Sequence, residues 1–383
     1  MPDFIFQTVP DIYVEDGGSK RLGEILNQKI GHNRTCLLVT DKGIKAAGLL
    51  KPLQASLMHG GHKVVVFDNV TPDPTEKLVF TATKLAIEND CDTYIGFGGG
   101  SSMDVARVAS ILSKGRQNLG DMYGIGNVVG QRAPLIQIPT TSGTGSEVTS
   151  ISVITTGETT KLAVIAPELY ADIAILDATL TLGLPSHITA ATGIDAMVHA
   201  LEAYTSKLKK NPISDGLAQK ALKLLGDNIK QACHNPDDLS ARRNMQIGAM
   251  LAGQAFANSP VAGVHALAYP LGGHFHVSHG LSNSLILPHV LLFNANAAKH
   301  EYEEIAQILI GPGKRKNPGF SLADYFLGLA HKLGIETTLR QVGVKEKDLD
   351  LLARDAMLQS RLIVNNPKDI NEADARKIYR EAY

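Results

Sequence analysis

The chain has 383 residues, of which 44% are hydrophobic and 20% are charged, and its formal net charge is −1. This length exceeds what a single hydrophobic core usually supports, so we expect two domains. The balanced charge argues against nucleic acid and anionic membranes as partners, and the three widely separated cysteines exclude a disulfide framework and a four-cysteine zinc site. Because we find neither an apolar stretch of membrane-spanning length nor a secretory leader, we expect a soluble cytoplasmic protein.

The first part of the chain alternates between patterns typical of strands and of helices. Short β-branched or aliphatic runs predict five strands, at residues 35–39, 63–67, 93–97, 135–138 and 173–176. Segments compatible with helices lie between the earlier strands, at residues 19–30, 43–60, 75–89 and 102–114. Strands separated by helices favour a parallel sheet with helices on both faces. We interpret the stretch from Thr149 to Lys161 as a hairpin inserted in that sheet.

The pattern becomes helical after Asp177 and stays helical to the end of the chain. A glycine and a proline in ATLTLGLPSH mark the change, and we place the domain boundary near residue 183. The expected architecture is an α/β domain over residues 1–182 and an all-helical domain over residues 183–383. In the helical part, apolar side chains recur at helical spacing, at Ile213, Leu217, Ala221, Leu224 and Leu225.

Two glycine-rich segments of the α/β half are candidates for nucleotide binding. The strand at 93–97 runs into GGGSSMDVARVAS, where free N–H groups and the dipole of the following helix favour an anion such as a diphosphate. The strict G-x-G-x-x-G fingerprint is absent, because Ser101 stands three positions after Gly98. The segment 138–150, rich in hydroxyls, can also donate hydrogen bonds to phosphate or ribose. A tight turn and a polar surface loop are the alternative interpretations.

Asp41 ends the first of the five predicted strands, in LLVTDKG. A carboxylate at a strand end can accept hydrogen bonds from both ribose hydroxyls of adenosine, and it repels a 2′-phosphate. In the usual fingerprint this acid follows the glycine turn by about 20 positions, whereas Asp41 precedes it, so the arrangement is not the standard Rossmann one. The alternative interpretation is that Asp41 caps the next helix.

The helical half contains a pattern typical of a metal site. Five of the 13 histidines fall within 25 positions, namely His265, His274, His276, His279 and His289. Asp195 and His199 stand four apart in TAATGIDAMVHALEAYTS and therefore share one helix face. Three imidazoles and one carboxylate suit iron(II) or zinc and leave room for a substrate oxygen. A simple hydrogen bond between Asp195 and His199 is the alternative, and composition does not select which histidines bind.

Five ordered segments resemble the iron-dependent (group III) alcohol dehydrogenases: GFGGGSSMD, IPTTSGTGSE, AATGIDAMVHALEAY, VHALAYPLGG and SHGLSNSLILPHV. The resemblance covers essentially the whole chain, including RLIVNNPKDI near its end. It implies a dehydroquinate synthase-like architecture, with a dinucleotide-binding α/β domain, an all-α domain and catalysis in the cleft between them. It also implies that small alcohols and their aldehydes or ketones are interconverted, with a metal polarising the alcohol oxygen and hydride passing to nicotinamide. A homodimer or larger homo-oligomer is expected, because the family often forms such assemblies.

The resemblance further assigns residues to each part of the site. The implied metal ligands are Asp195, His199, His265 and His279. The residues implied to hold the diphosphate are Gly98, Gly99, Gly100, Ser101 and Ser102. The rest of the cofactor site is implied to consist of Thr140, Thr141, Thr144 and Lys161, with Leu180 near the nicotinamide. Asp41 and Asp73 match positions at the adenosine end, and the acid at Asp41 favours NAD over NADP. Iron(II) is the implied metal, with zinc as the alternative.

The sequence departs from the family pattern in the residues that handle protons. Many members have a histidine where this chain has Tyr269, and aromatic or polar residues where it has His274 and His276. We therefore expect proton transfer through His274 or His276, because an imidazole titrates near neutral pH and a tyrosine does not. The alternatives are that both histidines are polar surface residues and that water carries the proton.

Two functions of other classes compete with the dehydrogenase. A lyase resembling dehydroquinate synthase binds a highly anionic substrate and needs cationic side chains near its ligands. The segments 189–206 and 261–284 contain no lysine or arginine, which argues against this function. A non-catalytic nucleotide-binding or structural protein is the other competitor, and the complete ligand set argues against it.

Overall fold

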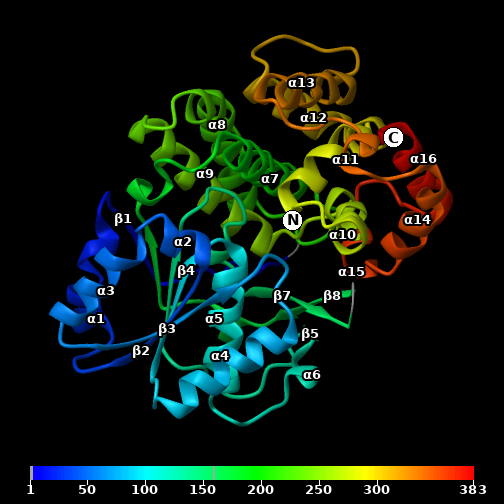
Figure 1. Ribbon diagram of the computed structural model, residues 1–383. Helices are drawn as coiled ribbons and strands as arrows, with labels where there is room; N and C mark the ends of the chain where they lie inside the picture. Colours follow the sequence, from blue (N-terminus) through cyan, green and yellow to red (C-terminus); the bar gives the residue numbers. More distant parts are fainter. Residues whose placement is uncertain (1–2, 158–159) are drawn as a thin grey trace. The chain divides into compact units, whose positions relative to one another are not determined.

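The computed structural model describes residues 3–157 and 160–383, which form two compact units (Figure 1). The first unit comprises Gln7–Thr141 and Gly145–Leu182. The second comprises Gly183–Tyr383 together with Ser142–Thr144 and the N-terminal segment up to Phe6. Among the described residues, none of the helices combines the length and the apolar character that a membrane crossing requires.

The first unit is built on a six-stranded sheet with the order β1-β9-β6-β4-β2-β3. Every neighbouring pair of these strands is parallel, which confirms the predicted parallel sheet. Its strands are β1 (Asp11–Val14), β2 (Thr35–Asp41), β3 (Lys63–Val70), β4 (Thr93–Gly98), β6 (Leu135–Pro139) and β9 (Ile173–Leu176). All six residues of β4 are buried, as is expected for a central strand covered on both faces.

Helices cover both faces of this sheet. They include α1 (Leu22–Lys29), α2 (Lys42–Ala46), α3 (Leu50–His59), α4 (Glu76–Glu88) and α5 (Gly100–Leu112). The unit also contains the short helix α6 (Leu119–Met122). Alternate strand residues such as Ile95 and Phe97 share a core with α1 and α3. The opposite face meets α5, where a Cβ on Gly96 would lie 2.9 Å from Met103 Cα. The single helix predicted over 43–60 is in fact two helices, because Gly48 adopts a positive φ of 76° between them.

The hairpin predicted over 149–161 exists but does not enter the main sheet. Strands β7 (Ile151–Thr156) and β8 (Thr160–Ile165) pair antiparallel, and β5 (Gly124–Ile125) joins them in a separate three-stranded sheet. Residues 158 and 159, in the connection, lie outside the described residues. The buried and half-buried positions alternate at the start of β7, unlike those of β4, as is typical of an antiparallel sheet with one covered face.

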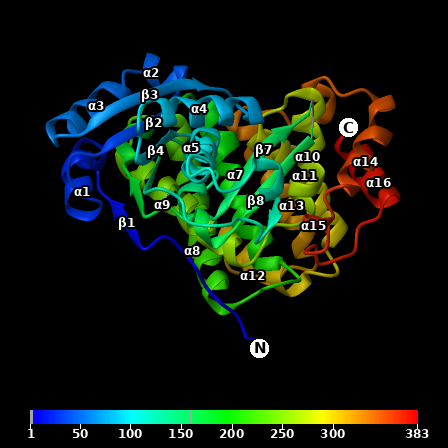
Figure 2. The same ribbon diagram turned by 90° about the horizontal axis from the view of Figure 1, so that it is seen from below.

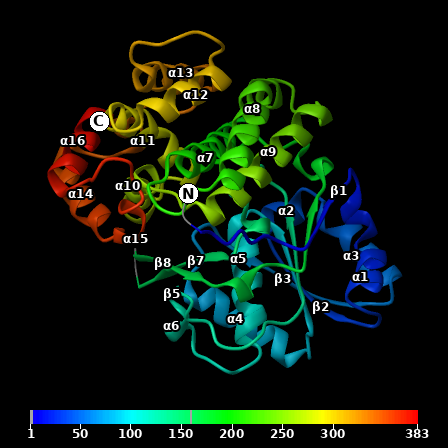
Figure 3. The same ribbon diagram turned by 180° about the vertical axis from the view of Figure 1, so that it is seen from behind.

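Within its described residues, the second unit beyond Gly183 contains helices and no strand, as predicted. Its helices are α7 (Ser186–Thr205), α8 (Pro212–His234), α9 (Leu239–Asn258), α10 (Gly263–Phe275), α11 (His279–Asn294), α12 (Lys299–Leu309), α13 (Pro318–Leu333), α14 (Leu349–Met357), α15 (Ser360–Ile363) and α16 (Glu372–Ala382). Helix α7 is buried almost throughout and packs against α8, α9 and α11 (Figure 2). Helices α14 and α16 lie side by side near the C-terminus (Figure 3).

The buried face of α8 is rotated from the predicted one. Ile213, expected in the core, is 45% exposed, and Leu217 and Leu224 are only partly buried. The face that packs inward consists of Ser214, Ala218, Ala221, Leu222, Leu225, Ile229, Ala232 and Cys233. Small residues at the start of this face allow α8 to lie close to α7, a requirement of packing that hydrophobicity alone does not reveal.

Candidate active site

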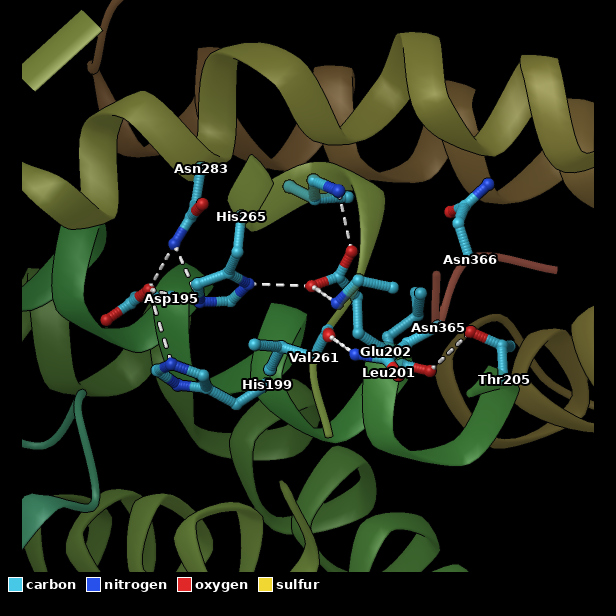
Figure 4. Close-up of polar contacts among 12 residues, drawn as sticks. Asp195, His199, Leu201, Glu202, Thr205, Val261, His265, Asn283, Asn365 and Asn366 are labelled. Carbon is cyan, nitrogen blue, oxygen red and sulfur yellow. Dashed lines mark hydrogen bonds and ion pairs between the residues drawn. The ribbon is translucent and has the colours of Figure 1, made fainter. Parts of the chain in front are cut away.

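The four implied metal ligands come together inside the helical unit. Figure 4 shows three of them, Asp195, His199 and His265. Asp195 and His199 lie on α7, His265 lies on α10, and His279 begins α11. One ligand atom from each of these residues lies within 4.8 Å of the corresponding atom of every other. His279 is half-buried, with 31% of its side chain exposed, whereas the other three are buried. His279 is therefore the most exposed of the four.

The close approach of α11 to α7 depends on a glycine. A Cβ on Gly280 would lie 2.4 Å from the carbonyl oxygen of Ala191 and 3.3 Å from Asp195 Cβ. Any larger residue at this position must push the start of α11 away from α7. Because His279 is the preceding residue, Gly280 determines how near His279 lies to Asp195.

We expect Gly280→Ala to destabilise the protein by about 1–3 kcal/mol, the usual cost of overpacking, and to weaken metal binding. Denaturant unfolding and titration of the apoprotein with zinc measure the two effects. Gly216→Ala in α8 is the matched control, because a Cβ there meets no atom within 4 Å. It should be neutral or slightly stabilising, by up to about 1 kcal/mol. Unchanged zinc affinity in Gly280→Ala would show that this contact does not set the ligand geometry.

Burial and charge give the ligands the protonation states that a cation needs. Burial lowers the pKa of His199 to about 3, although the neighbouring Asp195 carboxylate opposes that shift. Burial also acts to raise the pKa of Asp195, but His199, His279, His265 and the Asn283 amide together outweigh it and lower this pKa. Near neutral pH the cluster thus offers an ionised carboxylate and a neutral His199 imidazole, the forms in which these side chains bind metals.

Asn283, one helical turn after His279, shows where the ligand atoms converge. Its Nδ2 donates to Asp195 Oδ1 at 2.6 Å and lies 3.2 Å from His265 Nε2 and 3.3 Å from His279 Nε2. A positively polarised amide group therefore lies close to three of the four ligand atoms. The donor set, three nitrogens and one carboxylate oxygen, fits a divalent cation such as iron(II) or zinc.

Aromatic contacts hold the imidazole rings in place. Phe256 of α9 stacks on His199 with a centroid distance of 4.4 Å, and His199 stacks on His265 at 4.7 Å. Tyr269, the residue that departs from the family pattern, lies beside the ligand His279 with ring centroids 5.9 Å apart. Tyr269 is thus a neighbour of the metal cluster and a candidate hydrogen-bond partner for substrate.

His274 and His276 are placed differently from the four ligands. His274 Nε2 is hydrogen-bonded to Asp355 of α14. His276 is exposed and ends α10 in a left-handed conformation with φ 54°. Among the described residues, neither histidine belongs to the group that can hold a metal. Their role in proton transfer stays a prediction.

The prediction is tested by the pH–rate profiles of His274→Phe and His276→Asn, with metal content measured first. Removal of a relay imidazole should change the pH dependence of the rate and leave metal content at the wild-type level. If both metal-loaded variants keep the wild-type rate and profile, water accepts the proton instead.

In the α/β unit, Asp41 and the glycine turn face each other. Strands β2 and β4 are neighbours, so their carboxyl ends lie at one edge of the sheet. Asp41 Oδ1 accepts hydrogen bonds from the N–H groups of Gly43 and Ile44 and thereby caps α2. Its Oδ2 lies 3.4 Å from the position of a Cβ on Gly98. The helix cap considered as an alternative is present, and the second oxygen is directed to the glycine turn.

The two glycine-rich segments meet at the ends of β4 and β6. Gly98 has a φ of 152°. Gly99, the N-cap residue of α5, has no side chain that could bond the first N–H groups of the helix. The N–H of Thr140 donates to the Gly98 carbonyl at 3.0 Å, and Thr141 Oγ1 would lie 3.9 Å from a Cβ on Gly99. Gly100, Ser101 and Ser102 form the first turn of α5. This arrangement is typical of an anion site at a helix N-terminus.

The remaining implied cofactor residues are scattered. Lys161 Nζ forms an ion pair with Asp73 Oδ1 at 2.6 Å, so two residues assigned to different parts of the cofactor contact each other. Leu180 is buried in the core of the sheet. Thr144 belongs to the helical unit, while Thr140 and Thr141 belong to the α/β unit.

Two side chains that touch the cluster were missed by sequence reasoning. Glu202 is bonded to His265, and Asn283 contacts three ligands. Glu202 stands three positions after His199, and Asn283 stands four positions after His279, so each shares a helix face with a ligand. A search for polar residues at helical spacing from the ligands would have found both.

Comparison with known proteins agrees with this geometry. Residues 10–178 match the family described as iron-containing alcohol dehydrogenase, and residues 189–383 match the Fe-containing alcohol dehydrogenase family, C-terminal. The chain is thus an oxidoreductase that acts on CH–OH groups. Within that class it belongs to the iron-containing alcohol dehydrogenase family, as the resemblance of its motifs predicted.

Individual relatives cover nearly the whole chain. Long-chain-alcohol dehydrogenase 1 of Geobacillus thermodenitrificans is 40% identical over 91% of this chain and 89% of its own. The structure of a 1,3-propanediol oxidoreductase superimposes with a TM-score of 0.94 at 32% identity, covering 100% of both chains. That of sulfoacetaldehyde reductase from Bifidobacterium kashiwanohense in complex with NAD+ has a TM-score of 0.89 at 27% identity, covering 100% of this chain and 99% of the other. These proteins are named for three different substrates.

Proposed function

We propose that this protein is an NAD-dependent, divalent-metal-dependent alcohol dehydrogenase that interconverts small alcohols with aldehydes or ketones. The observation that carries the proposal is the convergence of Asp195, His199, His265 and His279 on one point. NAD is supported by Asp41, whose Oδ2 is directed to the glycine turn, and by the NAD+ complex of the related sulfoacetaldehyde reductase. Residues 1–182 would form the dinucleotide-binding domain and residues 183–383 the metal-binding, catalytic domain.

When bound, iron(II) or zinc supplies Lewis acidity towards the alcohol oxygen, and NAD supplies the hydride acceptor. The protein's own residues do the positioning. Asp195 provides a fixed negative charge, and burial keeps His199 neutral so that its lone pair is free. The uncapped N-terminus of α5 offers N–H groups to the diphosphate, while Asp41 accepts from ribose hydroxyls and disfavours NADP. The proton leaves through His274, His276 or water.

The test is a panel of short alcohols, diols and hydroxy acids, assayed with NAD and with NADP on apoprotein reloaded with Fe²⁺ or Zn²⁺. We expect NADH formation that requires the metal, with NAD preferred over NADP. The proposal is contradicted if the metal-loaded protein forms no NADH or NADPH with any alcohol and consumes neither NADH nor NADPH with the matching aldehydes.

We further propose, from the family resemblance, a homodimer or larger homo-oligomer in the cytoplasm. Light scattering during size-exclusion chromatography measures the mass of the particle, and a monomeric mass would contradict the assembly.

A further inference from the structure

Glu202 is a buried carboxylate of α7 that lies next to the metal cluster. It stands one turn after His199, and only 2% of the residue is exposed. Its Oε2 lies 2.7 Å from His265 Nδ1 and accepts from the N–H of Ala262 at 2.9 Å, while its Oε1 accepts from the N–H of Val264 at 2.6 Å (Figure 4). One side chain therefore contacts both the ring of His265 and the backbone around it.

The contacts of Glu202 determine which nitrogen of His265 carries the proton. The backbone N–H groups of Ala262 and Val264 are obligatory donors, so both carboxylate oxygens act as acceptors. Beside an ionised Glu202 carboxylate, which has no hydrogen to donate, the His265 Nδ1 that meets Oε2 is the donor and carries hydrogen. Neutral imidazole has a single N–H, so Nε2 of His265 keeps its lone pair.

A second contact fits the same form of the ring. His265 Nε2 lies 3.2 Å from Asn283 Nδ2, an amide donor, and 4.0 Å from the carboxylate oxygen of Asp195. An Nε2 that accepts from Asn283 carries no hydrogen. The contacts at Nδ1 and at Nε2 are thus consistent with the same tautomer, in which the lone pair of Nε2 faces the other ligand atoms.

Glu202 also anchors the start of α10. Ala262 is the N-cap residue of α10 and has no side-chain cap of its own, so the carboxylate from α7 satisfies N–H groups that the helix leaves open. Asn365 holds the preceding residue, donating from Nδ2 to the Val261 carbonyl at 2.9 Å. The position of His265 along α10 therefore depends on contacts from α7 and from the C-terminal NNP segment.

We propose that Glu202 is a positioning residue for metal binding, holding His265 in the tautomer whose Nε2 is free to ligate a divalent cation. This inference rests on the metal dependence of the proposed function. An outer carboxylate of this kind orients a ligating imidazole and raises its basicity, and its loss typically costs about 10–100-fold in metal affinity.

The test is Glu202→Gln, which keeps the size of the side chain but replaces one acceptor oxygen by an NH₂ donor. Every orientation of this amide sets a donor against a backbone N–H or against His265 Nδ1. We expect Zn²⁺ affinity, measured by competition with a chromophoric chelator, to fall about 10–100-fold.

Thr205→Val is the matched control on the same helix. The Thr205 hydroxyl is buried and donates to the Leu201 carbonyl at 3.0 Å, so the variant removes a buried hydrogen bond without touching His265. We expect wild-type Zn²⁺ affinity in Thr205→Val. Wild-type affinity in Glu202→Gln, or an equal loss in both variants, would overturn the inference.

A measurement on the wild-type apoprotein decides the matter even if Glu202→Gln does not fold. In histidine labelled with ¹⁵N, the ring shifts distinguish the two tautomers, and the His265 signals are assigned by their absence in His265→Ala. We expect hydrogen on Nδ1; hydrogen on Nε2 would overturn the inference. Failure of wild-type protein to bind Zn²⁺ would instead contradict the proposed function, and the tautomer result would still stand on its own.

Discussion

His265→Ala should lose both bound metal and alcohol turnover. The substitution removes one of the three imidazoles of the cluster and leaves the buried carboxylate of Glu202 without the ring that it contacts. Changes to residues that only support a ligand cost about 10–100-fold in metal affinity, so loss of a ligand itself should cost more than about 100-fold. Elemental analysis of the purified variant and NADH formation with a primary alcohol measure the two effects.

His300→Ala is the control for this prediction. His300 lies on α12 with 83% of its side chain exposed, so its removal changes histidine content without touching the cluster. We expect wild-type metal content and rate in His300→Ala. Full metal occupancy with a normal rate in His265→Ala would show that the ligand assignment is wrong.

The main features of the fold were predictable because their signals are local. Runs such as TCLLV and TYIGF are β-branched or aliphatic and bounded by polar residues, and they form β2 and β4. The edge strand β1 was missed, because four residues with three half-buried positions give a weak pattern. The hairpin β7–β8 was recognised but assigned to the wrong sheet, since the choice of sheet depends on contacts such as the hydrogen bond from the Val153 N–H to Asp104.

The ligand pattern was visible in the sequence in part only. Asp195 and His199 share a helix face by spacing, but His265 and His279 were selected by family resemblance among five clustered histidines. Composition cannot separate them from His274, because what distinguishes His274 is a bond to Asp355, 81 positions away. Tertiary contacts of this kind determine which histidines meet, and a local pattern does not contain them.

The segment 138–150 was predicted as a single polar loop near the cofactor. Its middle part, Ser142–Thr144, groups with the helical unit. The reason is steric, because a Cβ on Gly143 would lie 2.8 Å from Thr192 Cβ on α7. The glycine that suggested a phosphate-binding loop is thus needed for close packing against a helix.

The second large effect concerns the choice of cofactor. Asp41→Gly should reduce catalytic efficiency with NAD about ten- to a hundredfold, because a charge-assisted hydrogen bond to ribose contributes about 1.5–3 kcal/mol. Efficiency with NADP should fall less, or rise, because the carboxylate that repels a 2′-phosphate is gone. The kcat/KM values for both cofactors, measured with saturating alcohol, give the ratio.

The helix cap made by Asp41 requires a variant that separates the two roles. Asp41 Oδ1 accepts hydrogen bonds from the N–H groups of Gly43 and Ile44, so Asp41→Gly also removes a helix cap. Replacing such a capping residue by alanine typically costs about 0.5–2 kcal/mol of stability, and replacing it by glycine costs less. Asp41→Ser keeps a capping oxygen and removes the charge. If the carboxylate selects the cofactor, Asp41→Ser should show the same loss of preference for NAD as Asp41→Gly, with a smaller loss of stability. Two results would show that Asp41 acts only as a helix cap and that other residues select NAD. Either Asp41→Ser retains the wild-type preference, or kcat/KM falls equally with NAD and with NADP in both variants.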